Sequence, residues 1–186
     1  MISGNRIRLR AIEREDLALF VTWLNDPQVL EGLSLYFPLS NHVEERWFEN
    51  MMQKPAEEHP LMIEVKEDNN WVSIGDIGLM NLDWRNRSAE LGIQIGDKNY
   101  WDHGYGSEAI KLFLRHSFET LNLNRVTLRV FETNLRARHV YQKIGFVQEG
   151  VLRKAFYQQG RYIDEIVMSV LKSEWDHANE ESGIIP

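Results

Sequence analysis

The sequence predicts a mixed α/β fold, in which helices flank a central mixed β-sheet. Two observations support this prediction. Short segments with the two-residue period of half-buried strands recur along the chain, and segments with the 3.6-residue period of amphipathic helices separate them. Their order is a strand, two helices, a meander of three strands, a helix, a strand, a helix and a closing hairpin. That order is typical of helices packed on one sheet.

Strands are expected where charged and apolar residues alternate, or where short apolar runs lie between turn residues. Residues 6–11 alternate arginine with apolar side chains, which indicates a half-buried strand. The turns include Asp68-Asn69-Asn70 and Gln159-Gly160. The other expected strands are 61–66, 71–81, 88–96, 125–130, one from Phe146 and one near 162–171.

Helices are expected over residues 13–25, 41–53, 107–121 and 134–144. The clearest spans 107–121, because its apolar side chains fall on one face. Asp26-Pro27 is expected to end the first helix. Asn41 and Glu44 have the spacing of a capping box at the start of the second, and Gly145 is expected to stop the last.

The length and composition suit a single globular domain. The chain has 186 residues, of which 43% are hydrophobic and 26% charged, and it shows no repeat or linker. We therefore expect one domain over 5–172, followed by a polar and frayed tail over 173–186.

The charge and the missing cysteines exclude several classes of function. Because 21 Lys and Arg face 28 Asp and Glu, the net charge is −7, which disfavours nucleic-acid binding and favours a cationic small substrate or peptide. Without cysteine there is no disulfide, thiolate zinc site or cysteine nucleophile. No two histidines have metal-ligand spacing, so no metal is expected. Without a long apolar stretch or a signal peptide, we expect a cytoplasmic protein that does not bind membranes.

The most informative segment runs from Tyr100 to Ala109 and ends in a strong helix. Its glycines, Gly104 and Gly106, expose successive main-chain N–H groups at the helix N-terminus, where an anion such as a diphosphate binds well. The other interpretation of these two glycines is a tight turn with a glycine cap, without a ligand. A nucleotide P-loop is excluded, because no lysine precedes Ser107.

A dinucleotide-binding fingerprint is a closer rival. Gly104-x-Gly106-x-x-Ala109 matches it literally, and Glu132 lies about the right distance downstream. However, residues 97–103 separate the first glycine from the preceding strand, and too few strands follow to build the usual parallel sheet.

From Asn5 to about Leu171 the chain resembles the GNAT superfamily of N-acetyltransferases, in the branch of ribosomal-protein alanine and spermidine acetyltransferases. The resemblance rests on three segments in order: Trp101-Asp102-His103-Gly104-Tyr105-Gly106-Ser107-Glu108-Ala109, Asn134-Leu135-Arg136-Ala137 and Tyr141-Gln142-Lys143-Ile144-Gly145-Phe146. The family's loop often opens with Arg or Gln, where this chain has Trp101.

The resemblance implies a GNAT-like fold with a partly splayed sheet and an enzyme that uses acetyl-CoA. The diphosphate would bind the N–H groups from His103 to Ser107, and the pantetheine arm would lie beside the strand 90–95. In the family this strand splays from 126–130. The implied cofactor-binding residues are Ile93, Gln94, Ile95, Trp101, Asp102, His103, Gly104, Tyr105, Gly106, Ser107, Asn134, Ala137, Tyr141 and Lys143.

Amine attack on a thioester requires a base, an oxyanion site and a proton for the departing thiolate. N–H groups near Ile93 would bind the oxyanion. Tyr141 is the candidate acid, because a phenol stays protonated at neutral pH; packing in the core is its other interpretation. Glu90 is the candidate base, with a solvated strand residue as the alternative. His139 and His103 are weaker candidates.

The acceptor is expected to be a small amine or a peptide N-terminus. It would dock against the first helices, the loop 32–40 and the final hairpin. Leu30, Leu35, Tyr36 and Phe37 would line the mouth or belong to the core, and Glu31 and Glu44 would attract a cation. The closing hairpin would also support a homodimer. The alternative function is a non-catalytic sensor or scaffold that binds acyl-CoA.

Overall fold

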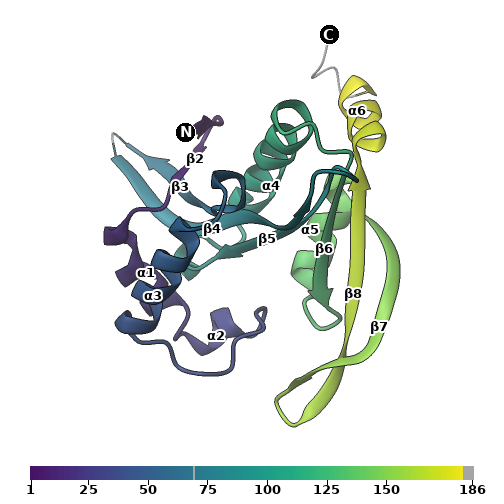
Figure 1. Cartoon of the computed structure of the whole chain (residues 1–186). Helices are drawn as coiled ribbons and strands as arrows, with labels where there is room; N and C mark the ends of the chain where they lie inside the picture. The colour runs from purple at the N-terminus through teal and green to yellow at the C-terminus, as the bar shows by residue number, and fades with distance from the viewer. Residues whose placement is uncertain (69, 182–186) are drawn as a thin grey trace. The chain divides into compact units, whose positions relative to one another are not determined.

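The computed structural model describes residues 1–68 and 70–181. Its strands form a mixed sheet with the order β1-β2-β3-β4-β5-β6-β8-β7, and helices pack on it (Figure 1). The predicted mixed α/β class is confirmed. The strands are β1 (Ile2–Ser3), β2 (Ile7–Ala11), β3 (Leu61–Glu67), β4 (Asn70–Asp83), β5 (Ser88–Ile95), β6 (Arg125–Phe131), β7 (Val147–Gln158) and β8 (Arg161–Leu171).

The helices follow the amphipathic segments of the sequence. They are α1 (Leu17–Trp23), α2 (Pro27–Leu30), α3 (Asn41–Met52), α4 (Tyr105–Arg115), α5 (Leu135–Ile144) and α6 (Lys172–Glu181). Three short 3-10 helices are Arg14–Asp16, Ala56–Glu58 and Lys98–Tyr100, and a π-helical turn, His116–Thr120, extends α4.

The chain forms two compact units that interleave in the sequence. The first comprises Met1–Met80 and Gly92–Phe113, and the second comprises Asn81–Leu91 and the chain from Leu114 onward. Strands β4 and β5 each begin in one unit and end in the other. The single domain expected over 5–172 stays a prediction.

In the first unit, β1, β2, β3 and β4 form an antiparallel ladder with helices on both of its faces. Met62 of β3 is buried in a cluster with residues of α1 and α3, including Phe20, Trp23 and Phe48. Ile95 and Gly96 are consecutive and point to opposite sides. A Cβ on Gly96 would meet Trp23 of α1 at 2.3 Å, whereas Ile95 lies against Gly106 of α4. Helices α1 and α3 therefore cover one face of the ladder, and α4 covers the other.

In the second unit, the first part of β5 pairs in parallel with β6, through Ser88–Glu90 and Arg125–Thr127. Strand β6 pairs antiparallel with β8, and β8 pairs with the edge strand β7. Alternate residues of β6 and β8 are buried, among them Leu128 and Met168. This alternation agrees with the period that predicted both strands.

Three local expectations are corrected by the structure. Helix α1 ends at Trp23, before Asp26. The Asp26 side chain instead caps α2 by accepting a hydrogen bond from the Gln28 N–H, with Pro27 in the first position. The N-cap of α3 is Ser40 rather than Asn41, and its Oγ accepts from the Val43 N–H at 3.3 Å. Glu44 is therefore not half of a capping box.

The segment from Ser173, expected to be frayed, begins as helix α6 and buries Trp175 against Phe118. Residues 182–186 of that tail and Asn69 of the predicted turn lie outside the described residues. Within the described chain, no helix is long and apolar enough to span a membrane.

Candidate active site

The glycine loop occupies the approach to α4 in the first unit. After β5, the Trp101 indole N–H donates to the carbonyl of Ile95 at 2.7 Å, which holds the loop against the end of its strand. Asp102 and Gly104 then have left-handed backbones, with φ of 64° and 81°. Helix α4 begins at Tyr105. Two left-handed residues so close together turn the chain sharply into the helix.

The first N–H groups of α4 have no acceptor within the helix. Those of Tyr105, Gly106 and Ser107 precede the first intrahelical donor, because the bond from the Glu108 N–H to the Gly104 carbonyl opens the helical ladder. A Cβ on Gly106 would meet the side chain of Ile95 at 3.7 Å, an ordinary contact. Packing within the chain therefore does not demand glycine there, whereas a diphosphate lying on the main chain does. A helix N-terminus of this kind suits an anion such as a diphosphate.

Arg6 fixes this loop from the start of the chain. Its guanidinium Nε donates to Glu108 at 2.8 Å, and its main-chain N–H donates to the same carboxylate at 2.9 Å. The guanidinium also reaches the His103 carbonyl at 3.3 Å and stacks over the ring of Tyr105. Because the Arg6 side chain is half exposed, it adds positive charge beside the glycine loop and the first N–H groups of α4. The sequence analysis missed Arg6, which lies about a hundred residues before the loop.

The second unit holds the predicted acid on α5. Asn134 caps this helix, and its Oδ1 accepts from the Ala137 N–H at 3.1 Å. Tyr141 lies two turns further on, is buried, and packs edge-on against Phe146 with ring centroids 5.8 Å apart. Lys143 and His139 are exposed on the same helix.

The environment of Tyr141 keeps its hydroxyl protonated. Burial raises the pKa of Tyr141 to about 12, because removal from water disfavours the phenolate. A phenol with this pKa donates a proton only to a strongly basic partner. A thiolate, whose thiol has an ordinary pKa of about 8.5, would be such a partner only where desolvation raises the pKa of that thiol as well.

The predicted base, Glu90, already has partners. Its carboxylate accepts from the Asn81 amide at 3.2 Å and lies 3.5 Å from the Arg129 Nε. The side chain is 19% exposed, so it is neither buried in the core nor fully solvated. The two contacts hold the carboxylate on the side of the second unit formed by β4, β5 and β6.

The strand segment Ile93–Ile95, assigned to the pantetheine arm, belongs to the first unit. The Gln94 side chain points to the face covered by α1 and α3, where its Nε2 donates to Asp76 Oδ1 at 2.6 Å. Ile95 points toward α4. Asp76 was missed by the sequence analysis, because a single aspartate within an apolar strand resembles a surface residue.

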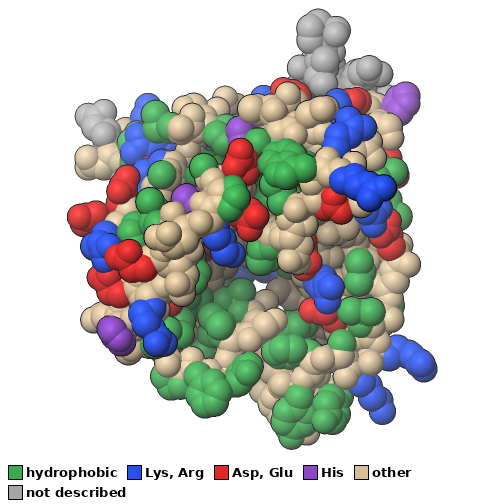
Figure 2. Space-filling view, viewed as in Figure 1, with side chains coloured by type: hydrophobic (Ala, Val, Ile, Leu, Met, Phe, Trp, Pro, Cys, Tyr) green, Lys and Arg blue, Asp and Glu red, His purple; other side chains and the backbone are tan. Residues whose placement is uncertain are grey.

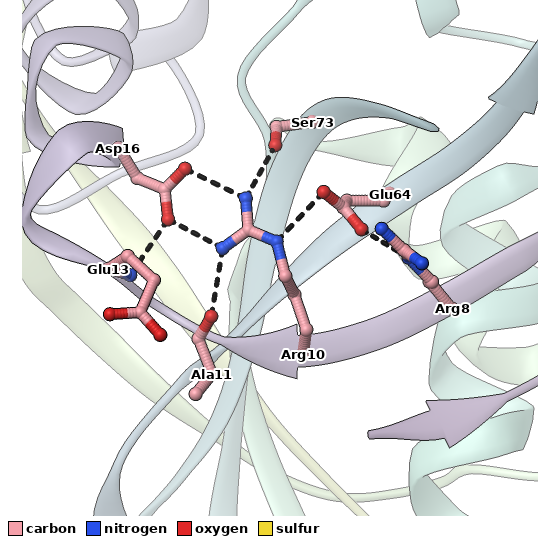
Figure 3. Close-up of polar contacts among 7 residues, drawn as sticks. All are labelled: Arg8, Arg10, Ala11, Glu13, Asp16, Glu64 and Ser73. Atoms are coloured by element: carbon pink, nitrogen blue, oxygen red, sulfur yellow. Dashed lines mark hydrogen bonds and ion pairs between the residues drawn. The ribbon is translucent and has the colours of Figure 1, made fainter. Parts of the chain in front are cut away.

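The same face carries a buried ion network centred on Arg10, which also escaped the sequence analysis (Figure 3). Arg10 donates to both oxygens of Asp16 at 2.6 and 2.8 Å, to Glu64 at 2.8 Å and to Ser73 at 3.1 Å. Arg8 binds the second oxygen of Glu64.

This network offsets the burial of its carboxylates. Burial opposes ionisation of Asp16, but the hydrogen bonds from Arg10 and from the Glu13 N–H lower the pKa of Asp16. The hydrogen bond to Asp16 in turn raises the pKa of Arg10. The network joins β2, β3, β4 and the chain before α1 (Figure 3). Its role is structural, because every charge in it has a partner.

Of the residues proposed for the acceptor mouth, Leu30 is half-buried and the other three are exposed rather than part of a core. Tyr36 is 79% exposed and Phe37 is 72% exposed, and their rings lie 5.0 Å apart. Leu35 is also exposed. Hydrophobic side chains gather over the loop that follows α2 in the space-filling view (Figure 2). Within the described residues, no group of three or more His, Asp or Glu is placed to hold a metal ion.

Comparisons with known proteins point to one family. The family model described as an acetyltransferase (GNAT) domain matches residues 6–147. A spermidine N(1)-acetyltransferase of Vibrio cholerae is 31% identical over 177 residues, which cover 95% of this chain and 99% of that protein. A Bacillus subtilis protein provisionally named a ribosomal N-acetyltransferase is 38% identical over 102 residues, or 55% of each chain.

Solved structures give the same result. The Vibrio cholerae spermidine N-acetyltransferase in complex with CoA and spermine matches with a TM-score of 0.84 and 28% identity, over 92% of this chain and 99% of that one. Since the family model covers most of the chain and the fold matches throughout, the chain belongs to the GNAT family of acetyl-CoA-dependent N-acetyltransferases.

Proposed function

We propose that this enzyme transfers the acetyl group of acetyl-CoA to a primary amine of a small molecule or of a protein N-terminus. The observation that carries the proposal is the start of α4, where N–H groups without an acceptor in the helix meet a glycine that the chain's own packing does not require. The residues from Trp101 to Ser107 would hold the diphosphate, while Ile93, Gln94 and Ile95 would offer main-chain groups to the pantetheine arm.

Tyr141 would protonate the departing sulfur. As the amine nitrogen bonds to the carbonyl carbon, the carbon–sulfur bond breaks and the thiolate needs a proton. The hydroxyl of Tyr141 is mostly buried, and burial keeps it protonated. Asn134 would bind the arm through its amide nitrogen, because its Oδ1 is occupied by the cap of α5. Ala137 and Lys143 on the same helix would also contact coenzyme A.

Glu90 would take a proton from the ammonium of the acceptor, directly or through water, so that the free amine can attack the thioester carbonyl. Its side chain keeps some access to solvent, and Asn81 and Arg129 fix its orientation. The acceptor is a small amine in the Vibrio cholerae relatives named for spermidine, which supports that class here. The absence of a metal and residence in the cytoplasm stay predictions.

Replacing Tyr141 with phenylalanine tests the proposal. The variant keeps the ring packed on Phe146, so calorimetry should give the same affinity for desulfo-CoA as in the unchanged protein. Thiol release from acetyl-CoA, with a panel of polyamines, amino acids and N-terminal peptides, should fall about 100-fold or more. If neither protein releases thiol with any amine while both bind desulfo-CoA, the chain is an acyl-CoA-binding module and the proposal is wrong.

A further inference from the structure

A second group of acidic side chains lies on the α1 and α3 face of the first unit. Asp76 of β4 is the cross-strand neighbour of Met62, which is buried in the cluster of α1 and α3 residues. Cross-strand partners project from the same face, so Asp76 points toward these helices. Gln94 of β5 donates to its Oδ1. Glu44, from the first turn of α3, is only 5% exposed.

The two carboxylates influence one another. Burial raises the pKa of Asp76 to about 7, and the negative charge of Glu44 adds to that rise. Burial also raises the pKa of Glu44. Asp76 nevertheless keeps part of its surface accessible to solvent. Glu44 also shares its buried helix face with Phe48 and Met51, which pack in the same cluster as Met62. Both carboxylates therefore project into this face of the first unit, where protein encloses them except for the exposed part of Asp76.

This pair differs from the other buried acids on the same face. Asp16 and Glu64 are bound by Arg10 and Arg8, as Figure 3 shows. Glu44 and Asp76 have no cationic partner among the described residues. An enclosed carboxylate without a cation is costly, and proteins normally pair it or protonate it. A ligand that brings a positive charge would remove that cost.

The third member of the group points to the same kind of ligand. The Oε1 of Gln94 is buried and has no hydrogen-bond partner within the described residues. When ionised, Glu44 and Asp76 offer only acceptors, as does this oxygen, so a ligand that completes the group supplies donors. A primary ammonium carries one positive charge and three N–H donors on one nitrogen, which matches two carboxylates and an amide oxygen.

The chemistry also tells which amine of an acceptor suits this group. A neighbouring negative charge favours the charged form of an amine and opposes loss of its proton. The reacting amine must lose that proton, so the acidic group suits an amine that stays charged. We infer that Glu44, Asp76 and Gln94 bind the non-reacting ammonium of an acceptor with two or more amines. This inference rests on the proposed function. A peptide with only its N-terminal amine lacks this group.

Two amines of equal chain length test the inference, namely 1,4-diaminobutane and butylamine. Calorimetry with the CoA-loaded protein should show that the diamine binds more tightly. Glu44→Gln and Asp76→Asn should each weaken the diamine about tenfold or more, because a charged hydrogen bond is lost, and should leave butylamine unchanged. Glu45→Gln is the matched control, since this neighbour on α3 is exposed and paired with Arg14.

The same variants separate this inference from the proposed function. In thiol-release assays, the preference in kcat/KM for the diamine over butylamine should fall about tenfold in both variants. If acetyl transfer proceeds but the preference is absent or unchanged, the inference is wrong and the function stands. If no transfer occurs but diamine binding is lost in Asp76→Asn, the function is wrong and the site stands. Saturable binding of MgCl2 that needs Asp76, without diamine binding, would assign the group to a divalent cation instead.

Discussion

Asp76 makes the stability of the native state depend on pH. In a flexible chain its carboxyl has an ordinary pKa of 3.8, and in the native state burial and Glu44 raise this to about 7. The native state therefore favours the protonated form. Its contribution to stability is complete below pH 4 and is lost as the pH rises through 7.

We therefore expect Asp76→Asn to raise the melting temperature at pH 8 relative to the unchanged protein, with this advantage shrinking toward pH 5. Thermal unfolding at pH 5, 6, 7 and 8 measures it. Asp83→Asn is the control. Hydrogen bonds from the Asn86 main chain and side chain lower the pKa of Asp83, so it stays ionised throughout this range and its effect should not vary. An equal shift at every pH for Asp76→Asn would contradict the expectation.

Glu90 offers a second prediction at this scale. Glu90→Gln keeps an oxygen for the Asn81 amide but removes the charge that would accept a proton. Because Glu90 is the proposed base, this substitution should lower kcat about 100-fold and leave the KM for acetyl-CoA unchanged. Initial rates against pH measure this. Asn81→Ala removes one of the two contacts that orient the carboxylate but keeps its charge, so it should lower kcat less than Glu90→Gln does. Unchanged kcat in Glu90→Gln would assign the proton to another group.

At the scale of elements, the two glycines at the start of α4 have different reasons to be glycine. The backbone conformation requires Gly104, whereas a bound diphosphate would require Gly106. Gly104 has a φ of 81°, so Gly104→Ala should destabilise the protein by about 1 kcal/mol or more. Gly106 lies within the helix and has room for a Cβ, so Gly106→Ala should be neutral or stabilising by about 0.5 kcal/mol.

The affinity for desulfo-CoA should show a different pattern. Gly106→Ala should weaken binding about tenfold or more, because the methyl group holds the diphosphate away from the N–H groups. Chemical unfolding and calorimetry on the two variants measure both effects. If Gly106→Ala binds desulfo-CoA as tightly as the unchanged protein, the diphosphate does not lie on this turn.

For the whole molecule, the expected homodimer stays a prediction, and the β7–β8 hairpin is the surface that supports it. Val147, Leu152, Tyr157 and Tyr162 are each at least 40% exposed there. Sedimentation should show a dimer, and Leu152→Asp with Tyr162→Asp should give a folded monomer. Met52→Asp, at an exposed apolar residue of α3, should leave the dimer intact. A monomeric unchanged protein at micromolar concentration would contradict this.

The sequence by itself determined the features that local chemistry controls. Alternation and helical periodicity predicted β2 to β8, and the glycines and capping residues predicted where α4 and α5 begin or end. The segment order and motifs identified the family, because they preserve local geometry at fixed spacing. Tyr141 was named from its motif, and its burial on α5 is consistent with the proposed role.

Only the tertiary structure decided which distant side chains meet. The contacts of Arg6 with Glu108, of Arg10 with Glu64, and of Gln94 with Asp76 join residues from 18 to 102 positions apart. No local period records such pairs, because strand register and helix packing set them. For the same reason the sequence could not show that Glu44 and Asp76 lie on one face of the first unit with no cationic partner among the described residues, and this arrangement carries the inference about the acceptor.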